Sequence, residues 1–178
     1  LEARVADRTR ELAIANKHLE ALSMTDLLTG LPNRRHAMQR LRLEWSEPLG
    51  GLACMMIDAD GFKRINDTYG HEAGDVVLQQ LAMQLRHMVR TDDLVCRLGG
   101  DEFLVICPHT PLAGALQLAE TMREKVAGEW RGSISVGVAE RRADMQGPDD
   151  LVRMADAGVY MSKRAGRNRV ETAMGAEA

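Results

Sequence analysis

Two adjacent carboxylates, Asp101 and Glu102, follow the glycine pair Gly99 and Gly100 between two short apolar stretches. The pattern predicts a tight β-hairpin with the acidic residues at its tip. Glycine allows positive φ and lets a bulky ligand approach the main chain, whereas neighbouring carboxylates repel each other unless a cation compensates them. The combination is typical of a metal–nucleotide site, although a solvated hairpin turn that contains acidic residues has the same pattern.

A third carboxylate, Asp58, directly follows the apolar run 52–57, which has the length of a central strand buried on both faces. If this strand lies beside the hairpin, Asp58 and Asp101 come within reach of one divalent ion. Hard carboxylate oxygens select Mg²⁺ or Mn²⁺, and these ions bind phosphates. Polymerase palms use such an arrangement for the in-line attack of a hydroxyl on an α-phosphorus. The acids therefore indicate nucleotidyl transfer.

The segment between these acids offers groups that can bind a nucleotide. Main-chain N–H groups of residues 61–67, together with Lys63, can cradle a polyphosphate. Asn66 and Asp75 suit a guanine edge, because the carboxylate accepts from ring and exocyclic N–H groups while the amide donates to a ring acceptor. Helix capping is the alternative role for both residues.

Residues 1–22 predict one continuous helix, because they are rich in Ala, Leu, Glu and Arg and contain neither Gly nor Pro. Apolar residues occupy the a and d positions of a heptad register, with Arg8 as the one polar intruder. They are Leu1, Val5, Leu12, Ala15, Leu19 and Leu22. We interpret the segment as the end of a longer signalling helix. An amphipathic helix folded onto its own domain is the alternative.

The remaining periodicity predicts a sheet flanked by helices. Helical patterns cover residues 34–44, 71–89, 112–126 and 148–163. Residues 133–138 alternate strictly between polar or small and apolar side chains, which predicts a half-buried strand.

Composition limits the class of protein. A length of 178 residues fits one domain with an appendage, and the net charge of −3 argues against nucleic acid or an anionic membrane as the main partner. The chain has neither an apolar run long enough to cross a membrane nor a signal sequence at its start. The cysteines, Cys54, Cys96 and Cys107, lie in apolar runs without metal-ligand spacing, which predicts reduced thiols in the cytoplasm. Any membrane anchor or sensor would belong to upstream domains.

Over about residues 24–172 the chain resembles the GGDEF family of diguanylate cyclases, whose name spells the signature. Six ordered segments carry the resemblance: residues 26–35, 58–71, 74–75, 99–103, 135–139 and 163–168. The resemblance implies an α/β, palm-like fold of the α+β type, with a central, mostly antiparallel sheet flanked by helices. It also implies a signalling helix over residues 1–23, a catalytic domain over 24–173 and a tail over 174–178.

The implied reaction condenses two GTP molecules into cyclic di-GMP with release of two pyrophosphates. It would need a homodimer, in which each half-site holds one GTP, and two Mg²⁺ or Mn²⁺ ions per active site. By position, Asp58, the backbone carbonyl of Ala59 and Asp101 resemble the metal ligands. Glu102 either helps to activate the ribose 3′-hydroxyl or completes the metal shell.

The family's substrate contacts also carry over by position. Asn66 and Asp75 match the guanine readers, and the remaining substrate-binding positions are Phe62, Lys63, Gly99, Gly100, Lys163 and Arg167. Among these, Lys63, Lys163 and Arg167 match phosphate ligands. For Lys163 and Arg167, a cationic helix C-terminus is the alternative reading.

Arg90 and Asp93 resemble the family's inhibitory product site, in which the arginine and the aspartate hold a guanine of cyclic di-GMP. Some members supply a further arginine from the next helix, at the position of Thr121, and Arg123 would point elsewhere. Two other readings stay open for the whole chain. One is a non-enzymatic receptor for GTP or the cyclic product, and the other is a cyclase or polymerase-like enzyme that uses another nucleotide.

Overall fold

The computed structural model describes residues 1–47, 51–129 and 132–175. Six helices and five strands lie within these ranges. The helices are α1 (Glu2–Leu22), α2 (Arg34–Ser46), α3 (Phe62–Tyr69), α4 (His71–Met88), α5 (Leu112–Glu129) and α6 (Pro148–Arg164). The strands are β1 (Leu52–Ala59), β2 (Leu94–Gly99), β3 (Glu102–Pro108), β4 (Ile134–Glu140) and β5 (Arg169–Glu171).

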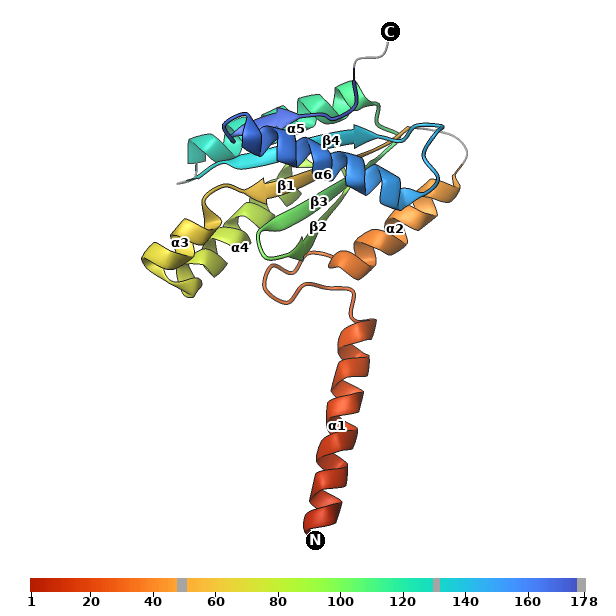
Figure 1. Cartoon of the computed structure of the whole chain (residues 1–178), viewed down its shortest axis with the longest axis vertical. Helices are drawn as coiled ribbons and strands as arrows, with labels where there is room; N and C mark the ends of the chain where they lie inside the picture. The colour runs from red at the N-terminus through yellow and green to blue at the C-terminus, as the bar shows by residue number, and fades with distance from the viewer. Residues whose placement is uncertain (48–50, 130–131, 176–178) are drawn as a thin grey trace.

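The strands form one sheet in the order β2-β3-β1-β4-β5. The strand β1 is central and antiparallel to both β3 and β4, while β5 alone is parallel to its neighbour. Helices α4 and α5 cover one face of the sheet, and α2 and α6 cover the other (Figure 1). The mostly antiparallel, palm-like sheet flanked by helices is therefore confirmed, and so is the central position of residues 52–57.

Strand β4 corrects one expectation. Residues 134–139 are buried on both faces, so the prediction of a half-buried strand is wrong. The small residues of the alternating pattern, Ser135 and Gly137, do not face solvent. A Cβ atom built on Gly137 would lie 1.9 Å from the carbonyl oxygen of Ala155 in α6. The alternation thus marks close approach of a helix.

We expect Gly158→Ala to destabilise this contact strongly. A Cβ on Gly158 would lie 2.7 Å from the Cα of Gly137 and 2.9 Å from the carbonyl oxygen of Glu171, and neither backbone atom can move aside cheaply. The free energy of unfolding should fall by roughly 3 kcal/mol. Urea unfolding followed by circular dichroism measures it. Gly128→Ala in α5 is the matched control, because its Cβ would meet open space.

Helix α1 projects away from the sheet and its helices (Figure 1). Val5, Leu12 and Leu19 are 62, 64 and 64% exposed, so the heptad stripe is not packed against the domain. The alternative of a helix folded onto its own domain is therefore excluded. In the described part of the chain, no helix combines the length and apolar character that crossing a membrane requires.

Two elements, helix α3 and strand β5, were not predicted from the sequence. Met174, which we placed in the C-terminal tail, is buried, and its sulfur accepts from the Glu140 N–H at 3.0 Å, so the packed domain includes it.

The three cysteines are unpaired and buried, as predicted. Burial raises the pKa of the Cys96 and Cys107 thiols to about 12, and it also raises that of Cys54.

Candidate active site

The carboxylates meet where β1 ends. Asp58 lies directly opposite Glu102 in the register of β1 and β3, so both side chains point to the same face of the sheet. The hairpin tip folds over this end, because the Ala59 N–H donates to the Asp101 carbonyl at 3.2 Å. Like charges directly opposite each other destabilise a sheet. Their convergence here calls for a compensating cation.

The pKa shifts of the acids agree with the need for a compensating cation. Burial first, and then the charge of Asp58, raise the pKa of Asp101 above its ordinary value. Burial followed by the charges of Asp58, Asp156 and Asp101 raises the pKa of Glu102 in the same way. Burial alone would lower the pKa of Lys163. The hydrogen bond from Lys163 to the Asp58 carboxylate and the charges of the nearby acids outweigh burial, so the pKa of Lys163 is raised overall. One ammonium therefore pairs with Asp58, while the raised pKa values indicate that negative charge at Asp101 and Glu102 is only partly compensated.

A cavity of about 520 Å³ opens beside the carboxylates. Six of the predicted site residues line it: Ala59, Phe62, Lys63, Asp101, Lys163 and Arg167. The lining also includes Arg64, which the sequence reasoning missed although it follows Lys63 directly. Four cationic side chains beside acidic ones suit a polyphosphate with a divalent ion.

The donor set fits a hard divalent cation only in part. Among residues 1–47, 51–129 and 132–175, no three His, Cys, Asp or Glu side chains converge, as they stand in this structure, closely enough to hold one metal ion by themselves. A cation at Asp58 and Asp101 would therefore need further oxygens, such as a main-chain carbonyl and the phosphates of a bound nucleotide. Mg²⁺ is usually held in this way, by one or two carboxylates and substrate phosphates.

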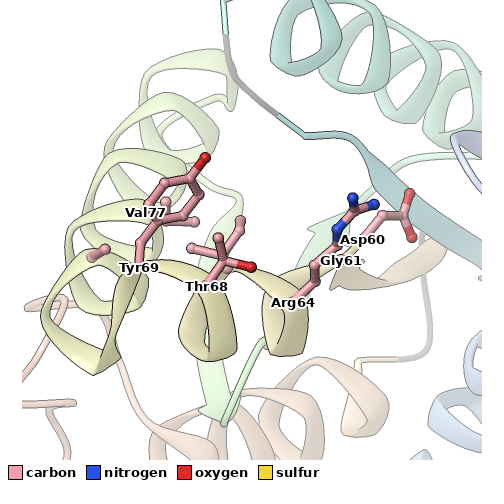
Figure 2. A pocket seen from close by; sticks show the side chains of 8 residues that line it. Asp60, Gly61, Arg64, Thr68, Tyr69 and Val77 are labelled. Carbon is pink, nitrogen blue, oxygen red and sulfur yellow. The ribbon is translucent and has the colours of Figure 1, made fainter.

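A larger cavity, of about 570 Å³, lies between α3 and α4 (Figure 2). Asp60 and Arg64 lie at one end of it, and Tyr69 and Val77 lie at the other. Gly61, Arg64 and Ile65 of the predicted main-chain cradle line it, but none of the predicted catalytic, metal-binding or guanine-binding side chains does, so most of the predicted chemistry lies outside the larger cavity.

The predicted guanine readers, Asn66 and Asp75, do not line the cavity of about 520 Å³ beside the carboxylates, which we call the phosphate cavity. The side-chain oxygen of Asn66 in α3 is buried without a hydrogen-bond partner. It faces Gly74 of α4, where a Cβ atom would lie only 1.8 Å from it, and the ring of Phe62 lies beside the same point. Asp75 is the next residue of α4 and is exposed. Because Phe62 also lines the phosphate cavity, it connects the two regions.

The hairpin tip is fixed by an arginine that the sequence reasoning did not single out. Arg97 donates to the Gly100 carbonyl from Nε at 3.1 Å and from a terminal nitrogen at 2.8 Å. The same guanidinium donates to the Asp26 carboxylate at 2.9 Å. Asp26 in turn accepts from the Thr29 N–H and hydroxyl, which closes the turn after α1. The tip therefore rests on the segment that leads from α1 into the domain.

Arg90 and Asp93 lie together in the turn that follows α4. Asp93 is buried and accepts from the Arg90 N–H at 3.0 Å, whereas the Arg90 side chain is 72% exposed. Both line a depression of about 410 Å³. Thr121 is exposed on α5. Arg123 donates to the Glu120 carboxylate and does not line this depression, which agrees with the expectation that it points elsewhere.

The palm-like sheet, the facing carboxylates and the cationic cavity define a nucleotide-processing domain. The family model described as "Diguanylate cyclase, GGDEF domain" matches residues 23–169. The chain belongs to this family. The response regulator PleD of Caulobacter vibrioides is 43% identical over 166 residues, which cover 86% of this chain and 37% of that protein. The diguanylate cyclase DgcM of Escherichia coli K12 is 41% identical over 162 residues, which cover 86% of this chain and 39% of that protein.

Solved structures agree with this assignment. The coiled coil and GGDEF domain of DgcB from Caulobacter crescentus, in complex with c-di-GMP, has a TM-score of 0.80 and 32% identity, and the match covers 97% of this chain and 99% of that one. The active GGEEF domain of a diguanylate cyclase from Vibrio cholerae has a TM-score of 0.77 and 30% identity, with 82% and 99% covered. The chain spans less than two fifths of the length of PleD and DgcM.

Proposed function

We propose that this chain is the catalytic domain of a diguanylate cyclase that condenses two GTP into cyclic di-GMP and two pyrophosphates. The observation that carries the proposal is the juxtaposition of Asp58, Asp101 and Glu102 with a cavity that Lys63, Lys163 and Arg167 line. The family supports the reaction class, and the facing carboxylates explain why a metal-dependent transfer suits this end of the sheet.

In each of two steps, a ribose 3′-hydroxyl oxygen attacks the α-phosphorus of the other nucleotide; a new O–P bond forms, the bond from that phosphorus to the oxygen that bridges to the β-phosphate breaks, and pyrophosphate leaves. Lys63, Lys163 and Arg167 would bind the phosphates. Glu102 would accept the proton of the 3′-hydroxyl or bind the cation. Asn66 and Asp75 would orient the guanine.

Two Mg²⁺ or Mn²⁺ ions would lie at Asp58, the Ala59 carbonyl, Asp101 and Glu102, and would supply charge stabilisation to the attacking and leaving oxygens. The proposal is tested by incubating the protein with GTP or with ATP in the presence of Mg²⁺ and separating the products. We expect cyclic di-GMP from GTP and no cyclic product from ATP. A cyclic product from ATP, or binding without turnover, would replace the proposal by one of the two other readings.

We also propose that cyclic di-GMP binds at Arg90 and Asp93 and inhibits the enzyme. Solved GGDEF domains of DgcB hold c-di-GMP, which supports a product-binding site in this fold. The buried Asp93 offers a fixed carboxylate, and the Arg90 guanidinium is accessible to a base.

Arg90→Ala should weaken product inhibition while leaving initial rates similar. The lost charge-assisted contact is worth roughly 1.5–3 kcal/mol, so the inhibition constant should rise at least about tenfold. Initial-rate measurements at increasing cyclic di-GMP give the constant. Arg42→Ala, at an exposed arginine of α2, serves as the control for loss of one charge. Equal inhibition of the parent and Arg90→Ala would remove Arg90 from the product site.

The reaction joins two GTP molecules, one from each half-site, so we propose that a homodimer is the active form. Specific activity should rise with protein concentration, and a parallel leucine zipper fused ahead of Leu1 should raise it at low concentration. Leu12→Asn should lower it, because Leu12 lies on the heptad stripe of α1. Ile14→Asn is the matched control, since Ile14 is equally exposed at 64% but lies off the stripe. Constant specific activity across a hundredfold dilution would contradict the role of α1.

A further inference from the structure

Asp60, the residue after β1, is a junction between separate elements. Its carboxylate accepts from the hydroxyl of Ser135 in β4 at 2.6 Å and from the hydroxyl of Ser133, which directly precedes β4, at 2.7 Å. It also accepts from the Asn168 N–H at 3.1 Å. Both carboxylate oxygens therefore have donors from the protein. Unlike Asp58, this acid is committed to holding structure together.

The turn that Asp60 holds has an unusual backbone. Gly166, Arg167 and Asn168 have φ values of 118°, 64° and 46°, all in the positive region that side chains disfavour. Such a conformation persists only where surrounding contacts enforce it. The Arg167 N–H donates to the Ser162 carbonyl at 2.9 Å, and the Asn168 N–H donates to Asp60. This turn places Arg167 in the lining of the phosphate cavity.

A second anchor reaches the turn from α5. Arg123 donates to the Asn168 side-chain oxygen at 3.1 Å, while its Nε donates to both oxygens of the Glu120 carboxylate at 3.0 Å. The Arg123 side chain is only 20% exposed, and the Glu120 carboxylate holds its guanidinium plane in one orientation. The turn is thus held from two sides, by Asp60 at its backbone and by Arg123 at its side chain.

We infer that Asp60 and Arg123 are positioning residues that hold the 166–168 turn so that Arg167 meets the terminal phosphates of the substrate. The inference rests on the proposed function, since it takes GTP as the ligand of the cavity. It assigns the second acid of the Asp58-Ala59-Asp60 run to shaping the phosphate site, and it gives Arg123, which does not line the cavity, a role in placing Arg167 there.

Arg123→Gln tests this role, because Arg123 contacts the turn but does not line the cavity. The probes are GMP and a GTP analogue with an α,β-methylene bridge, which cannot release pyrophosphate, both titrated with Mg²⁺ by calorimetry. We expect the dissociation constant of the analogue to rise about tenfold and that of GMP to stay unchanged. Lys125→Gln, at an exposed lysine of the same helix, removes the same charge and should change neither constant.

Arg123→Gln in an Arg167→Ala background completes a double-mutant cycle. If Arg123 acts through Arg167, Arg123→Gln should have no further effect on the analogue once the Arg167 guanidinium is absent. An effect of equal size in both backgrounds, or an equal loss of GMP and analogue affinity, would overturn the inference. Asn168→Gly removes the same bond from the other side and relieves the positive φ, so it serves if Arg123→Gln does not fold.

The cycle also separates this inference from the proposed function. If the parent makes cyclic di-GMP but Arg167→Ala binds the analogue as tightly as the parent does, the positioning role is wrong and the cyclase assignment stands. If the parent binds neither guanine nucleotide, the proposed function is wrong, and the inference is overturned together with it.

Discussion

Asp101→Asn is expected to abolish cyclase activity and, in the absence of divalent metal, to make the protein harder to unfold. The loss of activity follows from removal of a metal ligand, which should cost several kcal/mol in the transition state, or about a thousandfold or more in kcat. The gain in stability follows from the charge. Burial and the neighbouring Asp58 raise the pKa of Asp101, so the folded protein disfavours its ionised form.

The pH dependence of this effect has a definite sign. An acid whose pKa is raised by folding destabilises the protein at pH values above that pKa, and the cost disappears as the pH falls through it. The difference in unfolding free energy between Asp101→Asn and the parent should therefore be largest at neutral pH and should shrink in acid. Urea unfolding in the presence of a chelator, at neutral and acidic pH, measures it.

Asp58→Asn separates the two parts of this prediction. It should remove activity equally, but it should not stabilise the protein, because the Asp58 charge is paired with Lys163. Near-normal turnover of Asp101→Asn at saturating Mg²⁺ would show that Asp101 is not a metal ligand. A stability gain in Asp58→Asn as large as that in Asp101→Asn would show that the ammonium does not compensate the first acid.

Gly74→Ala is expected to weaken guanine recognition as strongly as Asn66→Ala. A Cβ atom at Gly74 would lie 1.8 Å from the Asn66 side-chain oxygen, so the amide must leave its present place. A site built around a base edge loses affinity when its polar groups are misplaced, and the preference for GTP over ATP should fall by about 10–100-fold. Asp75→Ala should relax the preference in the same direction.

Competition titrations with GTP and ATP measure this preference. Alanine in a helix interior is more favourable than glycine by about 1 kcal/mol, so a loss of affinity in Gly74→Ala cannot be ascribed to a weakened helix. Gly128→Ala, in the open part of α5, is the control for the substitution itself. An unchanged preference in Gly74→Ala and Asn66→Ala would assign guanine recognition to other residues.

Local patterns predicted the elements whose own residues determine them. The apolar run before Asp58 is strand β1 because a strand covered by helices on both faces has little room for polar side chains. The glycine pair forms the hairpin tip, where Gly99 and Gly100 both have positive φ. Helix α3 was missed because it has eight mostly polar residues between Gly61 and Gly70, so it lacks a long apolar period. Strand β5 depends on β4, its parallel partner in the sheet.

The candidate site divides in the same way. The acids and cations could be predicted from their types and positions, and the structure brings four of them, Lys63, Asp101, Lys163 and Arg167, to one cavity, while their roles stay predictions. The residues that hold the site could not be predicted, because their partners are distant in sequence. Asp60 bonds Ser133 and Ser135 across more than 70 residues, and Arg97 bonds Asp26 across 71.

Burial of all three native thiols makes the chain a convenient scaffold for site-selective labelling. Only the thiolate reacts rapidly with alkylating reagents, and burial both shields Cys54, Cys96 and Cys107 and disfavours their ionisation. A cysteine introduced on the exposed α1 would therefore be modified first in the folded protein. Spectroscopic probes attached there could report distances between two α1 helices without removal of the native cysteines, whose own slow alkylation would record global unfolding.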